Sequence, residues 1–194
     1  MNDEQLREFF LVGRTALSLQ IGHRISIDLD LFSITSFDEG QLLMYLEDVY
    51  KFKLDYQSKN TLKGQINAIK VDLITHSYPL VSPMIVDEDI RMASTEDIAA
   101  MKLNAIAGNG TRLKDFIDIA YLSSSLTLNQ MVEAYEQKYS SRNPVMLIKA
   151  LDYYNDIDFS EPIKMINGDY SWKKTEHRLG EMIRNPQRRF NSIV

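Results

Sequence analysis

Three aspartates in apolar segments are the residues of this sequence best suited to chemistry. Asp28 and Asp30 lie two residues apart in the run 25–32, where apolar and polar residues alternate. Residues two apart on a strand point to the same side, so both carboxylates would share one face. Asp72 lies in a second alternating apolar run, 65–75. An adjacent strand would bring Asp72 to the same place.

Three carboxylates at one place suit Mg²⁺, which prefers oxygen ligands. One or two such ions neutralise a triphosphate, orient its pyrophosphate leaving group and help a hydroxyl attack in line. We therefore predict Asp28, Asp30 and Asp72 as metal ligands and catalytic residues of a two-metal site. Two acids at this spacing are also common on solvated strand faces. Other residues of the sequence are therefore needed to distinguish a metal site from an ordinary surface.

Gly13 is such a neighbour, because it separates the apolar run 9–12 from a helix-like stretch, 15–21. A glycine between a strand and a helix lets the backbone approach phosphate closely, and the amide groups and dipole of the helix favour the anion. Most glycines at this position only turn the chain. Together with the three aspartates, however, Gly13 indicates a phosphate-binding turn.

Short strands and helices must position these residues up to about residue 90. The apolar stripe of 38–49 has helical spacing, and the turn-rich residues 58–64 would join two strands as a hairpin. A loop containing Pro79 and Pro83 would follow. We expect helices at 15–21 and 38–49, and strands at 9–12, 25–32, 52–57 and 65–75.

The pattern becomes helical from Ser94 onward. Ser94 and Asp97 form a variant capping box that opens a helix over 95–107. Further helices are expected at 113–122, from Thr127, from Pro144 and at 171–184. The predicted fold class is α+β: an α+β lobe, 1–90, precedes a helical lobe, 91–194, and the two could form one compact unit.

Composition and charge limit the remaining functions. The 194 residues include no Cys and no stretch of about 18 apolar residues, so we expect a cytoplasmic protein without a thiolate metal site or a membrane partner. The net charge of −5 argues against a protein that coats nucleic acid uniformly. The tail 173–194 nevertheless carries +4 and residues 1–172 carry −9, so a local patch could bind phosphate.

Two runs resemble one enzyme family. FFLVGRTALSLQIGHRISIDLDLF, residues 9–32, is similar to the signature of the AbiEii-type nucleotidyltransferase toxins of bacterial abortive-infection and toxin–antitoxin systems. That signature reads approximately LVGGTALAL, then GHR, then S-x-DLDFF. MKLNAIAGNGTRLKDFIDIAYL, residues 101–122, resembles the family's second block, in which a lysine helix is followed by a K-D-x-x-D-[IL] helix. Both blocks occur in the family's order.

The resemblance implies a fold, substrates and partners. The fold would be nucleotidyltransferase-like, with a small mixed sheet and helices followed by a helical C-terminal lobe. The enzyme would use a nucleoside triphosphate (NTP) and Mg²⁺, and would transfer a nucleotide to an RNA acceptor such as tRNA. A cognate antitoxin encoded alongside would restrain the toxin.

The resemblance also implies the roles of individual residues. Asp28 and Asp30 match the metal pair and Asp72 the third strand carboxylate. Asp118 is preferred over Asp115 for orienting the nucleotide or the attacking hydroxyl, and is predicted to be catalytic. His23 is expected to be structural. The nucleotide-binding residues implied are Gly13, Arg14, Thr15, Arg24, Lys102, Lys114 and Asp115.

Arg14 departs from the family pattern, which has a small residue after the glycine. Its side chain could add charge to the triphosphate site or fill it. The main hypothesis is an active Mg²⁺-dependent nucleotidyltransferase that modifies RNA as the toxin of a toxin–antitoxin or phage-defence system. Two alternatives stay open: a catalytically impaired relative that acts as a binding protein, and a nucleotidyltransferase with a protein or small-molecule acceptor.

Overall fold

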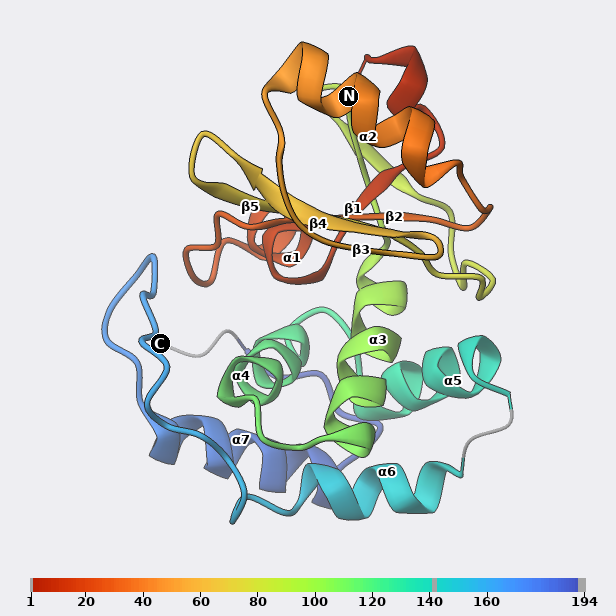
Figure 1. Ribbon diagram of the computed structural model, residues 1–194. Helices are drawn as coiled ribbons and strands as arrows, with labels where there is room; N and C mark the ends of the chain where they lie inside the picture. The colour runs from red at the N-terminus through yellow and green to blue at the C-terminus, as the bar shows by residue number, and fades with distance from the viewer. Residues whose placement is uncertain (1, 141–142, 192–194) are drawn as a thin grey trace. The chain divides into compact units, whose positions relative to one another are not determined.

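The computed structural model describes residues 2–140 and 143–191, and its contacts divide the chain into two compact units (Figure 1). Unit 1 contains Met1–Ala16 and Ser26–Ala93, and unit 2 contains Leu17–Ile25 and Ser94–Val194. The segment Leu17–Ile25 therefore packs with the C-terminal residues Ser94–Val194. A single boundary along the chain does not describe this division.

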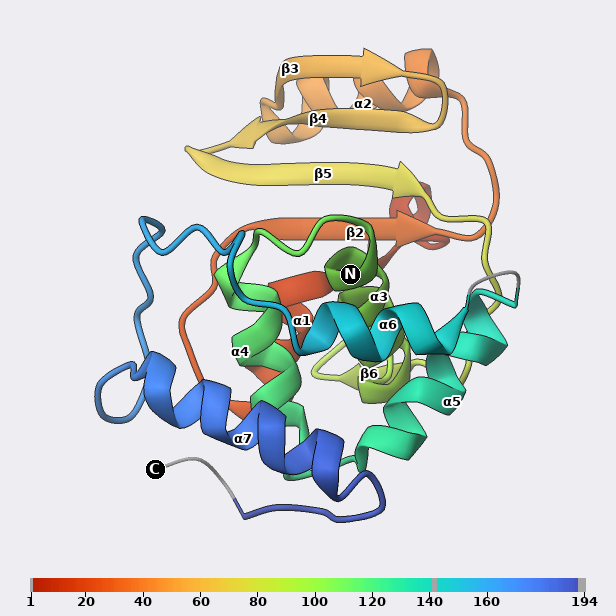
Figure 2. The ribbon, with the colours of Figure 1, turned by 90° about the horizontal axis from the view of Figure 1, so that it is seen from below.

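Unit 1 is built on a mixed sheet, as the predicted fold class requires. Among the described residues the sheet has seven strands, in the order β3-β4-β5-β2-β1-β7-β6. The pairs β2–β5 and β1–β7 are parallel, and the other neighbours are antiparallel. Figure 2 shows β2, β5, β4 and β3 side by side. The strands are β1 (Phe10–Val12), β2 (Leu29–Ser33), β3 (Lys53–Ser58), β4 (Thr61–Ile66), β5 (Ile69–Thr75), β6 (Ile85–Asp87) and β7 (Ile90–Met92).

Helices lie on both faces of this sheet. The α2 helix (Glu39–Tyr50) covers one face, α1 (Gly13–Ile21) begins on the other (Figure 1), and a 3₁₀ turn (Glu4–Leu6) precedes β1. The Asp38 side chain caps α2 by accepting a hydrogen bond from the Gln41 amide at 2.9 Å. The buried Leu42 and Leu46 follow the predicted apolar stripe.

Two sequence predictions for unit 1 were wrong, and one pair of strands was not predicted. The strand expected at 25–32 begins only at Leu29, and Ile27 is 64% exposed, so its alternation with polar residues does not mark a buried face. The residues expected to form a turn, 58–64, contain the start of β4, so that β3, β4 and β5 form a three-stranded meander. The short pair β6–β7, which was not predicted, begins at Ile85, after the expected loop containing Pro79 and Pro83.

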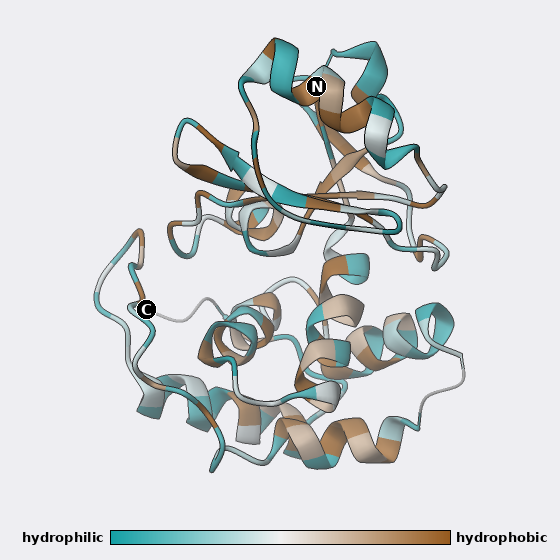
Figure 3. Ribbon diagram, in the orientation of Figure 1, coloured by the Kyte–Doolittle hydropathy of each residue, from teal (hydrophilic) through white to brown (hydrophobic). Residues whose placement is uncertain are grey.

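Unit 2 is helical where the sequence predicts helices. The α3 helix packs against α4, α5 and α6, and α4 packs against α7. Ser94 caps α3, Thr127 and Gln130 form a capping box on α5, and Pro144 is the first residue of α6. Figure 3 shows hydrophobic residues on α3 and α4 interspersed with hydrophilic ones. The helices are α3 (Thr95–Gly108), α4 (Leu113–Leu122), α5 (Leu128–Lys138), α6 (Pro144–Leu151) and α7 (Trp172–Arg184).

Gly64, in the middle of β4, is closely packed against its neighbours in the meander. A Cβ at Gly64 would lie 2.2 Å from the Lys53 carbonyl oxygen and 2.5 Å from the Phe52 ring. We expect Gly64→Ala to lower the free energy of unfolding by about 2–3 kcal/mol, because backbone and ring must both move. At Gly40, a Cβ would approach only Asp38 Oδ1, at 3.4 Å, so Gly40→Ala in α2 is the control. Urea denaturation of both variants checks this, and equal effects would contradict it.

Candidate active site

Asp30 and Asp72 lie side by side in the sheet. The parallel pairing of β2 with β5 places Asp30 opposite Asp72, between the pairs Leu29–Val71 and Leu31–Leu73. Alternation along both strands directs these two carboxylates to one face and the leucines to the other. The expectation that a neighbouring strand brings Asp72 beside Asp30 therefore agrees with the register. Asp28 lies one residue before β2 begins.

Gly13 brings the N-terminus of α1 to the same place. The antiparallel pairing of β1 with β2 puts Val12 opposite Asp30, and α1 begins at the next residue. Gly13 has a φ of +67°, and a Cβ at this residue would lie 2.7 Å from Asp30 Oδ2. The Asp30 carboxylate thus lies against the first residue of a helix, where the backbone dipole favours negative charge.

A side chain at residue 13 should disturb this contact. We expect Gly13→Ala to cost about 2–3 kcal/mol of stability, because the methyl group displaces the Asp30 carboxylate and the left-handed φ is strained. Gly22 also has a positive φ, +59°, but nothing lies within 4 Å of its Cβ position. Gly22→Ala therefore measures the backbone cost alone, about 1 kcal/mol. Thermal unfolding checks both variants, and equal losses of stability would contradict the role given to the Asp30 contact.

Arg14 lies at the acidic site and neutralises part of it. Its guanidinium donates to Asp28 Oδ2 at 2.9 Å, and both side chains are partly exposed. Thr15, by contrast, supports the strand. Its hydroxyl donates to the Asp28 backbone carbonyl and lies 2.9 Å from the Ser26 hydroxyl. In this conformation Thr15 holds the backbone of Asp28 in place.

Asp72 is buried, but it lies near two lysines. Lys63 Nζ lies 3.6 Å and Lys70 Nζ 3.3 Å from Asp72 Oδ2. Among the described residues, its other oxygen, Oδ1, is buried without a hydrogen-bond partner. A buried carboxylate oxygen without a partner is costly, which fits an oxygen that accepts a ligand. Lys63 and Lys70 have no sequence signal, because lysines on solvated strands follow no distinctive pattern.

The donor chemistry of these carboxylates fits a divalent cation, although their present positions do not yet enclose one. Within residues 2–140 and 143–191, no three or more His, Cys, Asp or Glu side chains come close enough together to hold a metal ion. Asp28 is engaged by Arg14 at the same time. Metal binding by Asp28, Asp30 and Asp72 therefore requires small side-chain movements.

Asp118 is the centre of a buried ion cluster in unit 2. Its Oδ1 accepts from His23 Nε2 and from Arg24 Nε, both at 2.8 Å. Its Oδ2 accepts from Arg24 Nη2 at 2.8 Å and lies 2.8 Å from Lys102 Nζ. The Asp118 side chain is 0% exposed. The four donors and the complete burial mean that in this conformation the Asp118 carboxylate is fully engaged inside unit 2.

The charges of the cluster explain the ionisation of Asp118. Burial alone would raise its pKa, but the Lys102 ammonium, the His23 hydrogen bond and the Arg24 guanidinium together hold the pKa well below its ordinary value. Lys102 also donates to Asp115 Oδ1 at 2.6 Å. Arg24, Lys102 and Asp115, all expected to bind nucleotide, are thus engaged with one another or with Asp118.

Lys114 and Asp115, both predicted to bind nucleotide, have further partners. Lys114, expected to bind nucleotide, forms an ion pair with Glu161. Arg112 Nε lies 3.1 Å from Asp115 Oδ2, and the Arg112 side chain is largely exposed. Glu161 follows Lys114 by 47 positions, which is too far for a helical or strand periodicity to reveal.

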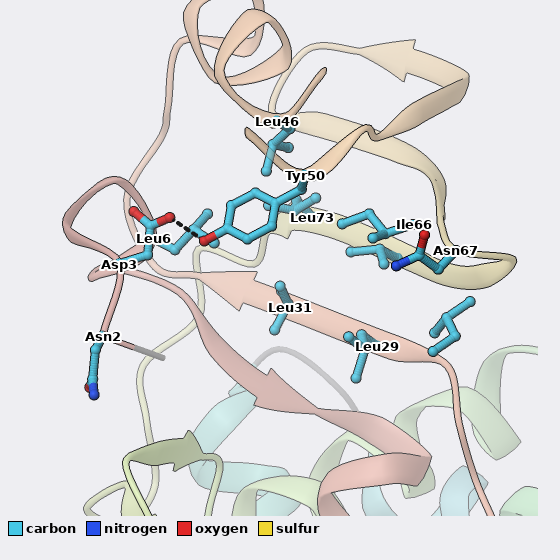
Figure 4. A pocket seen from close by; sticks show the side chains of 12 residues that line it. Asn2, Asp3, Leu6, Leu29, Leu31, Leu46, Tyr50, Ile66, Asn67 and Leu73 are labelled. Atoms are coloured by element: carbon cyan, nitrogen blue, oxygen red, sulfur yellow. Dashed lines mark hydrogen bonds between the residues drawn. The ribbon is translucent and has the colours of Figure 1, made fainter. Parts of the chain in front are cut away.

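The sheet face opposite the carboxylates contains a cavity of about 380 Å³ (Figure 4). Leu29 and Leu31 of β2 line it together with Leu46 of α2. At one end Tyr50 donates a hydrogen bond of 2.5 Å to Asp3. This bond, followed by burial, raises the pKa of Tyr50 to about 12. The apolar lining does not suit a triphosphate, so the carboxylate face is the candidate active site.

No helix in the described part of the chain is long and apolar enough to cross a membrane.

Comparisons with known proteins identify the family to which the chain belongs. The family model "Nucleotidyl transferase AbiEii toxin, Type IV TA system" matches residues 2–192, and the chain belongs to this family of nucleotidyltransferase enzymes. An uncharacterized protein of Aquifex aeolicus (strain VF5) is 32% identical over 155 residues, which are 77% of this chain and 75% of that protein.

Two Helicobacter pylori structures have the same fold. A candidate nucleotidyltransferase has a TM-score of 0.57 at 20% identity, over 91% of this chain and 85% of its own. The protein JHP933 has a TM-score of 0.53 at 18% identity, over 91% of this chain and 82% of its own. At these identities the likeness concerns the fold alone, and it confirms the nucleotidyltransferase-like architecture.

Proposed function

We propose that the protein transfers a nucleotide from an NTP to an RNA acceptor, with Mg²⁺ bound by Asp28, Asp30 and Asp72. The observation that carries this proposal is the direct pairing of Asp30 with Asp72, beside the N-terminus of α1 at Gly13. Bound Mg²⁺ would neutralise the triphosphate and the leaving pyrophosphate. A glycine at the start of α1 lets the backbone approach phosphate closely, and the helix dipole favours the anion.

The transfer forms one bond and breaks one. The acceptor hydroxyl oxygen bonds to the α-phosphorus, while the bond from that phosphorus to the bridging oxygen of the β-phosphate breaks and pyrophosphate leaves. The hydroxyl proton passes to a carboxylate. Asp72 is suited to take this proton, since its Oδ1 has no hydrogen-bond partner among the described residues.

Asp118 and its partners have a positioning role in this proposal. The buried bonds from Asp118 to His23 and Arg24 hold the segment that follows α1 against α4. A group that is 0% exposed and accepts four donors does not contact the reacting atoms. We therefore assign Asp118, predicted as catalytic, to positioning. Lys102 and Arg24 would bind nucleotide only by exchanging their present carboxylate partners.

The basic C-terminal segment supports an RNA acceptor. Most of its cations are exposed, which suits salt-sensitive contacts to phosphates. Arg178 and Arg188 both lie 4.9 Å from the centre of the Phe190 ring; residues 192–194 of the predicted tail fall outside the described residues. A toxin role, a cognate antitoxin and a cytoplasmic location stay predictions. The exposed cations are Lys173, Lys174, Arg184, Arg188 and Arg189.

The test is a labelling experiment. Purified protein is incubated with Mg²⁺, total RNA and each of the four α-labelled NTPs in turn, beside the double variant Asp28→Ala/Asp30→Ala. We expect label on RNA with wild-type protein and none with the variant. Label on a protein or small molecule instead would overturn the RNA acceptor, and the absence of both transfer and metal-dependent NTP binding would overturn the enzyme. Growth arrest on expression, relieved by a neighbouring gene, tests the toxin role.

One observation favours the second candidate, a catalytically impaired relative that acts as a binding protein. The guanidinium of Arg14 occupies Asp28 at 2.9 Å, where a metal ion would need the carboxylate. If Arg14 blocks the site permanently, Arg14→Gly creates transfer activity that the wild-type protein lacks.

A further inference from the structure

Three basic side chains lie against the carboxylates of the candidate site. Arg14 donates to Asp28 at 2.9 Å, and Lys63 and Lys70 approach Asp72 at 3.6 and 3.3 Å. They come from three different elements, α1, β4 and β5. The bases equal Asp28, Asp30 and Asp72 in number, so this group of six residues carries no net charge.

We propose that Arg14, Lys63 and Lys70 are exchangeable counter-ions. In the metal-free protein they neutralise Asp28 and Asp72, and when metal ions take the carboxylates they turn to the phosphates of the nucleotide. This inference rests on the proposed function, because it assumes that the carboxylates bind metal. It assigns a phosphate-binding role to Lys63 and Lys70 and gives the unusual Arg14 a use in catalysis.

The geometry suits an exchange of partners. The carboxylates belong to the sheet or its edge, whereas the side chains of Arg14, Lys63 and Lys70 are 23%, 39% and 54% exposed. Both lysine distances to Asp72 exceed those of a good hydrogen bond, so the lysines are held by charge alone. Partly exposed pairs of this kind contribute only about 0–1 kcal/mol. The three bases can therefore leave at little cost.

The chemistry of the ligands gives the exchange its direction. Carboxylates are preferred ligands of hard divalent cations, while Arg and Lys are the side chains that bind phosphate best. When metal ions occupy Asp28 and Asp72, the three cations lose their partners and would repel the metal unless an anion arrives. Metal and triphosphate should therefore bind cooperatively, and each alone should bind weakly.

The proposal predicts opposite effects on the two ligands. Removing a counter-ion frees a carboxylate, so Mn²⁺ alone should bind about fivefold more tightly to Arg14→Ala and to Lys63→Ala/Lys70→Ala than to wild-type protein. The same variants should bind inorganic tripolyphosphate, at saturating Mn²⁺, about fivefold more weakly. A residue that only supports the fold would not change the two affinities in opposite directions.

The experiment uses the full chain. Free Mn²⁺ is measured by electron paramagnetic resonance, and tripolyphosphate binding by calorimetry. Lys53→Ala is the matched control, because Lys53 is exposed on the neighbouring strand β3 and faces no site carboxylate in the register; it should change neither affinity. Asp28→Ala/Asp30→Ala should lose Mn²⁺ binding, which would show that the bound Mn²⁺ occupies the candidate site.

The outcomes separate this inference from the proposed function. If wild-type protein binds Mn²⁺ and transfers nucleotides, but the counter-ion variants bind Mn²⁺ as before or more weakly, the exchange is overturned and the enzyme stands. Unchanged tripolyphosphate affinity overturns it as well. Wild-type protein that binds neither Mn²⁺ nor tripolyphosphate counts against both proposals.

Discussion

Asp118→Asn is expected to lower the free energy of unfolding by about 3–5 kcal/mol. The change leaves the shape of the side chain but removes its charge, so the buried Arg24 and Lys102 lose their shared counter-ion. Removing one partner of a buried ion pair is costly because the other charge stays out of water. Urea denaturation at pH 7 measures the effect, and Asp156→Asn, at an exposed position, is the control.

The same residue makes stability depend on pH. In the folded protein the pKa of Asp118 lies well below its ordinary value. In the unfolded chain the pKa of an Asp side chain is about 3.9. Its contribution is therefore complete above about pH 4 and is lost as the pH falls further. We expect the wild-type protein to lose stability in this acidic range more steeply than Asp118→Asn.

A second variant tests whether a stranded charge is the cause. Asp118→Asn/Lys102→Met removes one of the unpaired cations and should recover part of the lost stability. A cost below about 1 kcal/mol for Asp118→Asn alone would show that the cluster does not hold unit 2 together.

Asp30→Asn is expected to lower nucleotide transfer by about a thousandfold or more. Asp30 is central to the site, because it contacts the start of α1 at Gly13 and pairs with Asp72 across the strands. Metal ligands stabilise transition-state charge by several kcal/mol, and each 1.4 kcal/mol or so corresponds to about tenfold in rate. Initial rates of label transfer at saturating Mg²⁺ check this expectation.

Stability should change little in that variant. Asp30 would lose its favourable contact with the start of α1, but this loss is offset by weaker repulsion from Asp28 and Asp72, which Arg14, Lys63 and Lys70 already balance. The control is Asp55→Asn on β3, where Asp55 is exposed and accepts a hydrogen bond from Gln65 at 3.2 Å. Asp30→Asn with full activity, or with a loss matched by Asp55→Asn, would contradict the assignment of Asp30.

Local chemistry explains what the sequence predicts well. Helix starts are set by side chains within one turn, such as Ser94 and Thr127, and these positions agree with the structure. The same holds for the carboxylate pairing, because alternation around Asp30 and Asp72 requires both to face one way. These signals lie within a few residues of the feature that they determine.

The sequence predictions fail where contacts between residues far apart in the chain determine the structure. In β4 only Leu62 and Gly64 are buried, so the strand has almost no hydrophobic signal and depends on its neighbours β3 and β5. The strand β6 exposes all three of its residues. For Asp118 the family motif predicts a catalytic residue, whereas the buried hydrogen bonds that occupy it come from His23 and Arg24, which no local pattern reveals.

The interleaving of the two units constrains the order of folding during synthesis. Arg24 is made 94 residues before its partner Asp118, and at translation rates of about 5–20 residues per second this interval lasts roughly 5–20 s. All strands of unit 1 are synthesised within that time, because β7 ends at Met92. Until Asp118 has been made, the cationic segment Leu17–Ile25 lacks its partners in unit 2, although all strands of the sheet are already present. A released chain truncated before Asp118 is therefore expected to protect the sheet from proteolysis and to be cut between Leu17 and Ile25.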